Sequence, residues 1–388
     1  MGKAYKILIM GLLVCILSLV AAIYRPINTA AAGISLNSSV KINFPNSITF
    51  SVNAQSSSNI IQLRLHYIVD MQNYATVVSE GWALFNPAKS VNTGWFWDMR
   101  KSALPPDSQV EYWWTALDAA GNITATEHAT LVFDDARYKW QSISQGPITI
   151  FWYNGARDFA DSLMTAAQQG LSRIENNVGA VPRGSVRIYI YASAQDLQSA
   201  QLFAQSWEGG VTFAEYNVIA IGVPTNQLSF GERAVPHELT HWIVHQITFN
   251  NYGAGLPVWL DEGLATYGES TTLNPDYQTA LEQAIQNSQL LSVRSLSSPF
   301  SAIPSVAYTS YGESNSIVTF MINTYGKDKM KQLLNVFHQG ATYDDALQQV
   351  YGFDQDGLNS AWLKSLGIAT TVTASIPATQ TMMAHATN

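Results

Sequence analysis

The chain has 388 residues, of which 12% are charged, with a net charge of −8, 11 Trp and 18 Tyr. This length suffices for two or three domains, and the aromatic content is typical of a folded protein and excludes a disordered one. An acidic chain without a basic stripe cannot neutralise phosphates, so we expect no nucleic-acid partner.

Residues 1–32 indicate an export segment. Two lysines precede the apolar run 7–24, and Ala30 and Ala32 are placed for cleavage of a signal peptide. The run is also near the length that spans a bilayer, so an uncleaved membrane anchor is the alternative. In either case we expect the rest of the chain to be extracytoplasmic, either secreted or held at the outer face of the cell membrane. Cys15, the only cysteine, lies in the run, so the mature chain has no disulfide.

Residues 33–135 contain short runs in which apolar and polar side chains alternate. The runs span residues 47–53, 62–68, 110–117 and 124–133. Alternation with a period of two, with turn residues between the runs, predicts an antiparallel β-sandwich of the immunoglobulin-like kind. Its tryptophans are more typical of core and cross-strand pairs than of a binding platform, so we assign this domain no ligand.

Residues 136–368 predict an α+β domain with a helical C-terminal lobe. Strands are expected at 148–153, 186–191, 211–213 and 218–222, with helices at 156–177 and 195–203. After the motif described below, helical segments are expected at 257–267, 275–287, 314–325, 327–338, 345–351 and 358–366. The Thr- and Ala-rich tail 369–388 is expected to be disordered.

The segment His237-Glu-Leu-Thr-His241 carries the strongest chemical signal. Two histidines four residues apart on a helix leave the same face, and neutral imidazoles are good ligands for Zn²⁺. Glu238 flanks that face, where it can accept a proton from an activated water. Because Pro236 lacks an N–H group, we expect it in the first turn, with the helix starting just upstream of His237.

Together with Trp259-Leu-Asp-Glu-Gly-Leu-Ala-Thr-Tyr267, this motif resembles the gluzincin metallopeptidases. The resemblance is to the bacterial peptidase MA-like domains, which are related to thermolysin and the aminopeptidase N family, and it covers about residues 148–366. It implies one Zn²⁺ per chain and makes Glu262 the third ligand. A catalytic zinc takes three protein ligands and keeps one open position, so His237, His241 and Glu262 complete the set. Asp261 is the rival carboxylate; one residue turns a helix by about 100°, so only one of the two can face the metal, and we expect Glu262.

The resemblance also implies an oxyanion donor from the helical lobe. Tyr311 matches the family's segment best, and Tyr308 is the alternative; simple packing of a tyrosine at a helix start explains either residue as well. Thr266 and Glu269 lie where they could orient a ligating histidine.

Two further residues near the motif are expected to stay outside the metal site. His245 lies about 6 Å farther along the helix than His241, which is too far to share the ion. Glu215 matches poorly the segment that holds a free amino terminus in the aminopeptidase N family, so endopeptidase activity is expected.

The leading hypothesis is therefore an exported zinc-dependent metallopeptidase that acts on peptides or proteins, with Glu238 as the general base. The alternative is a cell-surface adhesion or ligand-binding protein whose peptidase-like domain is catalytically inert.

Overall fold

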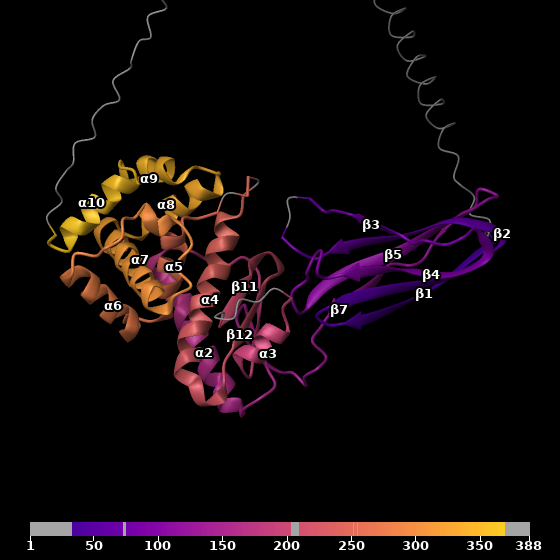
Figure 1. Ribbon diagram of the computed structural model, residues 1–388, viewed down its shortest axis with the longest axis horizontal. Coiled ribbons are helices and arrows are strands. Elements are labelled where there is room, and N and C mark those ends of the chain that lie inside the picture. The colour runs from indigo at the N-terminus through magenta and orange to yellow at the C-terminus, as the bar shows by residue number, and fades with distance from the viewer. Residues whose placement is uncertain (1–32, 73–74, 203–208, 251, 254, 369–388) are drawn as a thin grey trace, which may run out of the picture.

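The computed structural model describes residues 33–72, 75–202, 209–250, 252–253 and 255–368 (Figure 1). The predicted export or anchor segment 1–32 and the predicted disordered tail 369–388 lie outside the described residues. Within the described part, no helix combines the length and the apolar character needed to cross a membrane.

The first seven strands form one antiparallel sheet, called here the N-terminal sheet. Its strands are β1 (Ile34–Asn43), β2 (Ser47–Val69), β3 (Ser79–Trp82), β4 (Ala88–Asp98), β5 (Ser108–Asp118), β6 (Ile123–Ala125) and β7 (Ala129–Phe133). The long strand β2 pairs with β1, β3, β4 and β5, whereas β6 and β7 pair with β5. Alternation along the strands buries one side chain in two, as the sequence predicts, and Phe50, Leu65 and Trp114 lie in the resulting core.

The predicted immunoglobulin-like sandwich is not confirmed, because β2 links all its partners into a single sheet. Its first half pairs with β1 and β4, and its second half pairs with β5 and β3. The register shifts between Gln55 and Ile60, where one set of partners gives way to the other. A strand of 23 residues can take part in both halves of a sheet, which short separate strands cannot.

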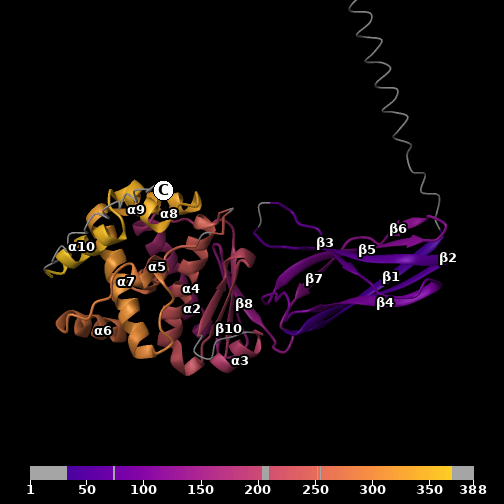
Figure 2. The same cartoon turned by 45° about the horizontal axis from the view of Figure 1, so that its top comes forward.

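The second sheet, called here the mixed sheet, has the order β11-β12-β10-β9-β8. Its strands are β8 (Gln141–Gln145), β9 (Ile148–Trp152), β10 (Val186–Tyr191), β11 (Gly210–Phe213) and β12 (Val218–Gly222). The three central strands are parallel and the two edge strands antiparallel. All residues of β12 are buried, as expected for a central strand with both faces covered. In Figures 1 and 2 this sheet lies between the helices and the N-terminal sheet.

Helices cover the mixed sheet and build the predicted helical lobe. They are α2 (Arg157–Asn177), α3 (Ala194–Ser199), α4 (Leu228–Thr248), α5 (Val258–Glu269), α6 (Pro275–Gln286), α7 (Pro304–Tyr325), α8 (Lys327–His338), α9 (Tyr343–Tyr351) and α10 (Gln355–Ser365), with short 3₁₀ turns η1 (Ala214–Tyr216), η2 (Thr225–Gln227) and η3 (Ser295–Ser297). The protein is thus a β-sheet region followed by an α+β region with a helical end.

The predicted start of the motif helix is wrong. Helix α4 begins at Leu228, so Pro236 lies inside it. Gly231 and Val235 are buried in that first part, and α2 packs so closely that a side-chain carbon on Gly170 would collide with the Pro236 ring. Tertiary packing therefore stabilises helical backbone that the local proline signal would have ended.

The N-terminal sheet contacts the rest of the chain through a hydrogen bond and an ion pair, among other contacts. The backbone N–H of Gln72 donates to the carbonyl of Glu215 at 2.7 Å. Arg187 on β10 forms an ion pair with Asp107, in the loop before β5. The N-terminal sheet therefore reaches the segment that follows β11, next to the motif helix.

Candidate metal centre

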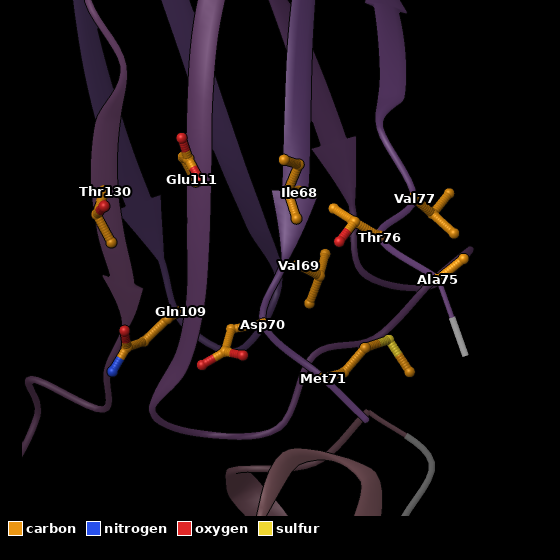
Figure 3. A pocket seen from close by; sticks show the side chains of 10 residues that line it. All are labelled: Ile68, Val69, Asp70, Met71, Ala75, Thr76, Val77, Gln109, Glu111 and Thr130. Atoms are coloured by element: carbon orange, nitrogen blue, oxygen red, sulfur yellow. The ribbon is translucent and has the colours of Figure 1, made fainter. Parts of the chain in front are cut away.

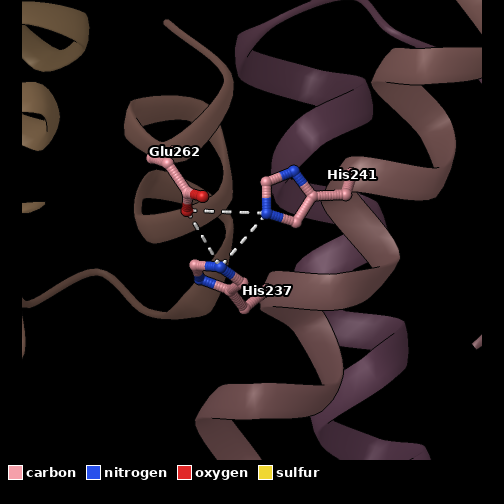
Figure 4. Close-up of side chains that lie close together, drawn as sticks. All are labelled: His237, His241 and Glu262. Atoms are coloured by element: carbon pink, nitrogen blue, oxygen red, sulfur yellow. Dashed lines mark hydrogen bonds and ion pairs between the residues drawn. The ribbon is translucent and has the colours of Figure 1, made fainter. Parts of the chain in front are cut away.

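Three side chains from two adjacent helices converge on one point (Figure 4). His237 and His241 come from α4 and Glu262 comes from α5. The Nε2 atoms of the two histidines are 3.2 Å apart. Oε2 of Glu262 lies 3.4 Å from Nε2 of His237 and 3.6 Å from Nε2 of His241. The three predicted ligands thus form a compact triangle.

The triangle fits a tetrahedral metal ion. Zinc–nitrogen and zinc–oxygen bonds of about 2.0–2.2 Å at tetrahedral angles separate two ligand atoms by about 3.3–3.6 Å. Oε2 of Glu262 is buried and has no hydrogen-bond partner among the described residues. A buried carboxylate oxygen left without a donor is costly, and a cation among the three atoms would satisfy it.

Each histidine is held from behind by a carboxylate. Nδ1 of His237 lies 2.9 Å from Oε1 of Glu269, and Nδ1 of His241 lies 2.9 Å from Oδ1 of Asp261. Donation from Nδ1 leaves the lone pair of Nε2 directed at the centre of the triangle. Asp261, the rival third ligand in the sequence, therefore lies at the far nitrogen of His241 rather than in the triangle.

His245 and Thr266, the other residues considered near the motif, both lie outside the triangle. His245 lies beyond His241, with its Nε2 atom 2.9 and 3.0 Å from the two oxygens of Asp261. Together with His241 and Asp261 it forms a second group of close ligand atoms. Thr266 does not reach a histidine and donates to the carbonyl of Glu262 at 2.9 Å.

The electrostatics of the centre favour positive charge. Burial alone would lower the pKa of His237, but the carboxylates of Glu262 and Glu269 outweigh it and raise that pKa to about 10. Burial likewise opposes charge on Glu262, yet the two imidazoles lower its pKa to about 2. The carboxylates therefore stabilise positive charge at the two imidazoles. Protons can supply this charge, or a metal ion that displaces the protons can supply it.

Glu238, the predicted general base, is oriented by the edge strand β11. The hydroxyl of Thr212 lies 2.7 Å from Oε2 of Glu238 and 2.9 Å from the carbonyl oxygen of Glu238, so it can donate its one hydrogen to either. A side-chain carbon on Gly210 would lie 2.8 Å from Oε1, so any other residue there would displace the Glu238 carboxylate. Neither residue stood out in the sequence, because they precede Glu238 by more than 20 residues and belong to no local motif.

Tyr311 lies beside the triangle, on α7. Its ring centroid is 6.4 Å from that of His237, and it stacks on Tyr277 at 5.0 Å. Burial, together with the negative charges of Glu262 and Glu238, raises the pKa of Tyr311, so its hydroxyl stays protonated and can donate. The alternative, Tyr308, is 36% exposed and packs against Tyr277 at 5.4 Å. Sequence reasoning did not single out Tyr277, whose helix α6 is far from the motif along the chain.

The N-terminal sheet has a cavity of its own, of about 510 Å³ (Figure 3). Asp70, Gln109 and Glu111 line it near the ends of β2 and β5, together with Val77. No residue of the metal centre lines it.

One known protein family matches the part of the chain that contains the metal centre. The family model for the peptidase MA superfamily matches residues 166–367, which is just over half of the chain and includes every residue of the triangle. No curated protein matches the chain.

Several solved structures resemble parts of the chain. OgpA from Akkermansia muciniphila is 14% identical, with a TM-score of 0.20 over 26% of this chain and 28% of its own. A family 64 β-1,3-glucanase from Paenibacillus barengoltzii is 17% identical, with a TM-score of 0.18 over 31% of this chain and 27% of its own. The sporulation control protein Spo0M from Bacillus subtilis is 7% identical, with a TM-score of 0.20 over 35% and 55%. The chain thus spans little more than a quarter of the first two and about half of the third.

Proposed function

The chain belongs to the peptidase MA superfamily, and from this premise we propose that it is a zinc-dependent metallopeptidase. The observation that carries the proposal is the triangle of His237, His241 and Glu262, with a buried oxygen of Glu262 that lacks a donor among the described residues. Two imidazoles and one carboxylate are the donor set of a catalytic zinc that keeps a position open.

In this proposal His237, His241 and Glu262 hold the ion. Zinc, when bound, supplies a Lewis acid that polarises the scissile carbonyl and makes water a better nucleophile. Glu238 accepts the proton of the attacking water and passes it to the leaving amine. The hydrogen bond from Thr212 keeps its carboxylate in place for both transfers. The hydroxyl of Tyr311 donates to the oxyanion that forms on the carbonyl.

The substrate in this proposal is a peptide or protein, cleaved as an endopeptidase would cleave it. Strand β11 lies at the edge of the mixed sheet, beside Glu238, so an extended chain could pair with its free side. We further propose that the enzyme is exported, with residues 1–32 as signal peptide or anchor, and that the part before about residue 135 is a separate domain.

The test is Glu238→Gln. We expect the variant to keep stoichiometric zinc, because Glu238 lies outside the ligand triangle, and to lose peptide-bond cleavage by at least about 10²-fold. Metal content is measured by elemental analysis, and cleavage by mass spectrometry after digestion of a broad peptide library. The same digest shows whether cuts fall inside chains or at their ends.

The outcomes separate the two hypotheses. Wild type that binds zinc but cleaves nothing in the library supports the inert adhesion or ligand-binding alternative. Purified protein without zinc, or unchanged cleavage by Glu238→Gln, refutes the proposed mechanism.

A further inference from the structure

A cavity of about 550 Å³ lies next to the metal centre, between β11 and the end of α4. Phe213 and Glu215 line it from the β11 side, His245 from α4, and Leu256 and Asp261 from the start of α5. Gln72 of the N-terminal sheet closes part of its wall and donates its backbone N–H to the Glu215 carbonyl at 2.7 Å. The cavity is therefore built by both halves of the chain.

Two residues connect this cavity to the catalytic groups. Thr212 lines the cavity and donates to the carboxylate of Glu238 at 2.7 Å. Asp261 also lines it and lies 2.9 Å from the Nδ1 atom of His241. A substrate bound at the metal centre would have its neighbouring side chain at this cavity.

The charge of the lining is negative. Glu215 and Asp261 are the acidic residues that line the cavity, and none of the described residues that line it is a lysine or an arginine. Asp261 is engaged with His241 and His245, whereas Glu215 is an exposed residue. The rings and aliphatic groups of Phe213 and Leu256 offer apolar surface beside the charge. A long side chain with an apolar stem and a cationic head matches both features.

We propose that this cavity is a substrate subsite that accepts the positively charged side chain of a lysine or arginine residue. The proposal deepens, and rests on, the proposed peptidase function. Glu215 is its specificity-determining residue, and Gln72 holds the backbone of Glu215 in position.

The direction of β11 predicts which side of the scissile bond this subsite serves. The strand runs from Gly210, beside Glu238, towards Phe213 and then Glu215 at the cavity. A substrate strand paired antiparallel to it runs the opposite way, so its residues at the cavity precede those at Glu238. The cationic group therefore lies on the N-terminal side of the cleaved bond.

The first experiment measures binding in zinc-loaded Glu238→Gln protein, which does not depend on turnover. Fluorescence anisotropy compares three labelled peptides of one sequence: acetylated with arginine, acetylated with citrulline, and citrulline with a free amino terminus. We expect the arginine peptide to bind about five- to tenfold more tightly than the acetylated citrulline peptide. Adding Glu215→Gln should remove this preference, and Glu215→Lys should reverse it. Glu111→Gln, which changes a carboxylate in the other cavity, is the matched control and should leave the preference intact.

The second experiment applies the same arginine–citrulline pair to cleavage by the wild type, with the charge moved along the peptide. We expect kcat/KM to rise only when arginine precedes the cut. Tighter binding of the peptide with a free amino terminus than of the arginine peptide, lost in Glu215→Gln, shows that Glu215 holds a chain terminus and overturns the side-chain subsite. Binding preference without any cleavage by the wild type refutes the peptidase function but keeps the subsite. Equal binding of all three peptides, or a preference unchanged in Glu215→Gln, overturns the subsite.

Discussion

Replacing Glu269 by glutamine should weaken metal binding although Glu269 is not itself one of the three proposed metal ligands. Oε1 of Glu269 lies 2.9 Å from Nδ1 of His237, and its side chain is only 7% exposed, so solvent screens the contact little. Glutamine keeps the shape but removes the charge that makes His237 a stronger donor of its Nε2 lone pair. A hydrogen bond to a charged group contributes about 1.5–3 kcal/mol, and loss of such partners typically lowers metal affinity by about 10–100-fold. We expect a loss in that range.

The assay is equilibrium competition for zinc against a chelator of known affinity, followed by kcat/KM at saturating zinc. Asp261→Asn should behave similarly, because Asp261 supports His241 at the same distance of 2.9 Å. Glu282→Gln on the exposed side of α6 is the matched control and should leave affinity unchanged. Zinc affinity in Glu269→Gln within twofold of the control would refute the idea that these carboxylates support the centre.

Three other outcomes follow from the structure. Tyr311→Phe should lower kcat by about 10²–10³-fold and leave KM and zinc content unchanged. Tyr308→Phe should have little effect. Equal effects of the two substitutions in steady-state kinetics would contradict the assignment of Tyr311. Burial raises the pKa of Glu313 from its usual 4.5 to about 8. Between these two pH values the unfolded chain ionises Glu313 and the folded chain does not, so the free energy of unfolding falls as pH rises from about 4.5 to 8. In urea unfolding, the free energy of unfolding of Glu313→Gln should therefore rise relative to that of the wild type over this pH range, by up to several kcal/mol. A difference that does not depend on pH would argue against a buried neutral acid. Gly263→Ala places a carbon 2.6 Å from the carbonyl oxygen of Ser314, so thermal unfolding should show a loss of about 1–3 kcal/mol; unchanged stability would mean that α5 and α7 can separate easily.

Local spacing explains why much of the centre could be predicted. Residues four apart on a helix must share a face, so His237 and His241 converge wherever the helix lies. The choice of Glu262 over Asp261 came from the resemblance and from the same rotation of about 100° per residue. Glu269, two turns after Glu262, was expected behind a histidine and is found at His237.

Two expectations that the structure did not confirm involve segments distant in sequence. Pro236 suggests a helix start, but packing against α2 extends α4 back to Leu228. The period-two runs of the first half predict strands correctly, yet they contain no information on which strand pairs with which. The 23-residue strand β2 pairs with four partners and joins these strands into one sheet, so the expected sandwich is not confirmed.

The sequence by itself determined the candidate residues of the centre: two imidazoles four residues apart on one helix, a carboxylate as the third ligand and a glutamate as the expected general base. Helical periodicity places the two imidazoles on one face, and the family resemblance adds the carboxylate. Only the tertiary structure decided what surrounds that chemistry. Thr212 reaches Glu238 because β11 lies along α4, and Glu215 reaches the neighbouring cavity because the strand continues past the metal centre. Such contacts depend on the packing of strand against helix, which no spacing within either segment encodes.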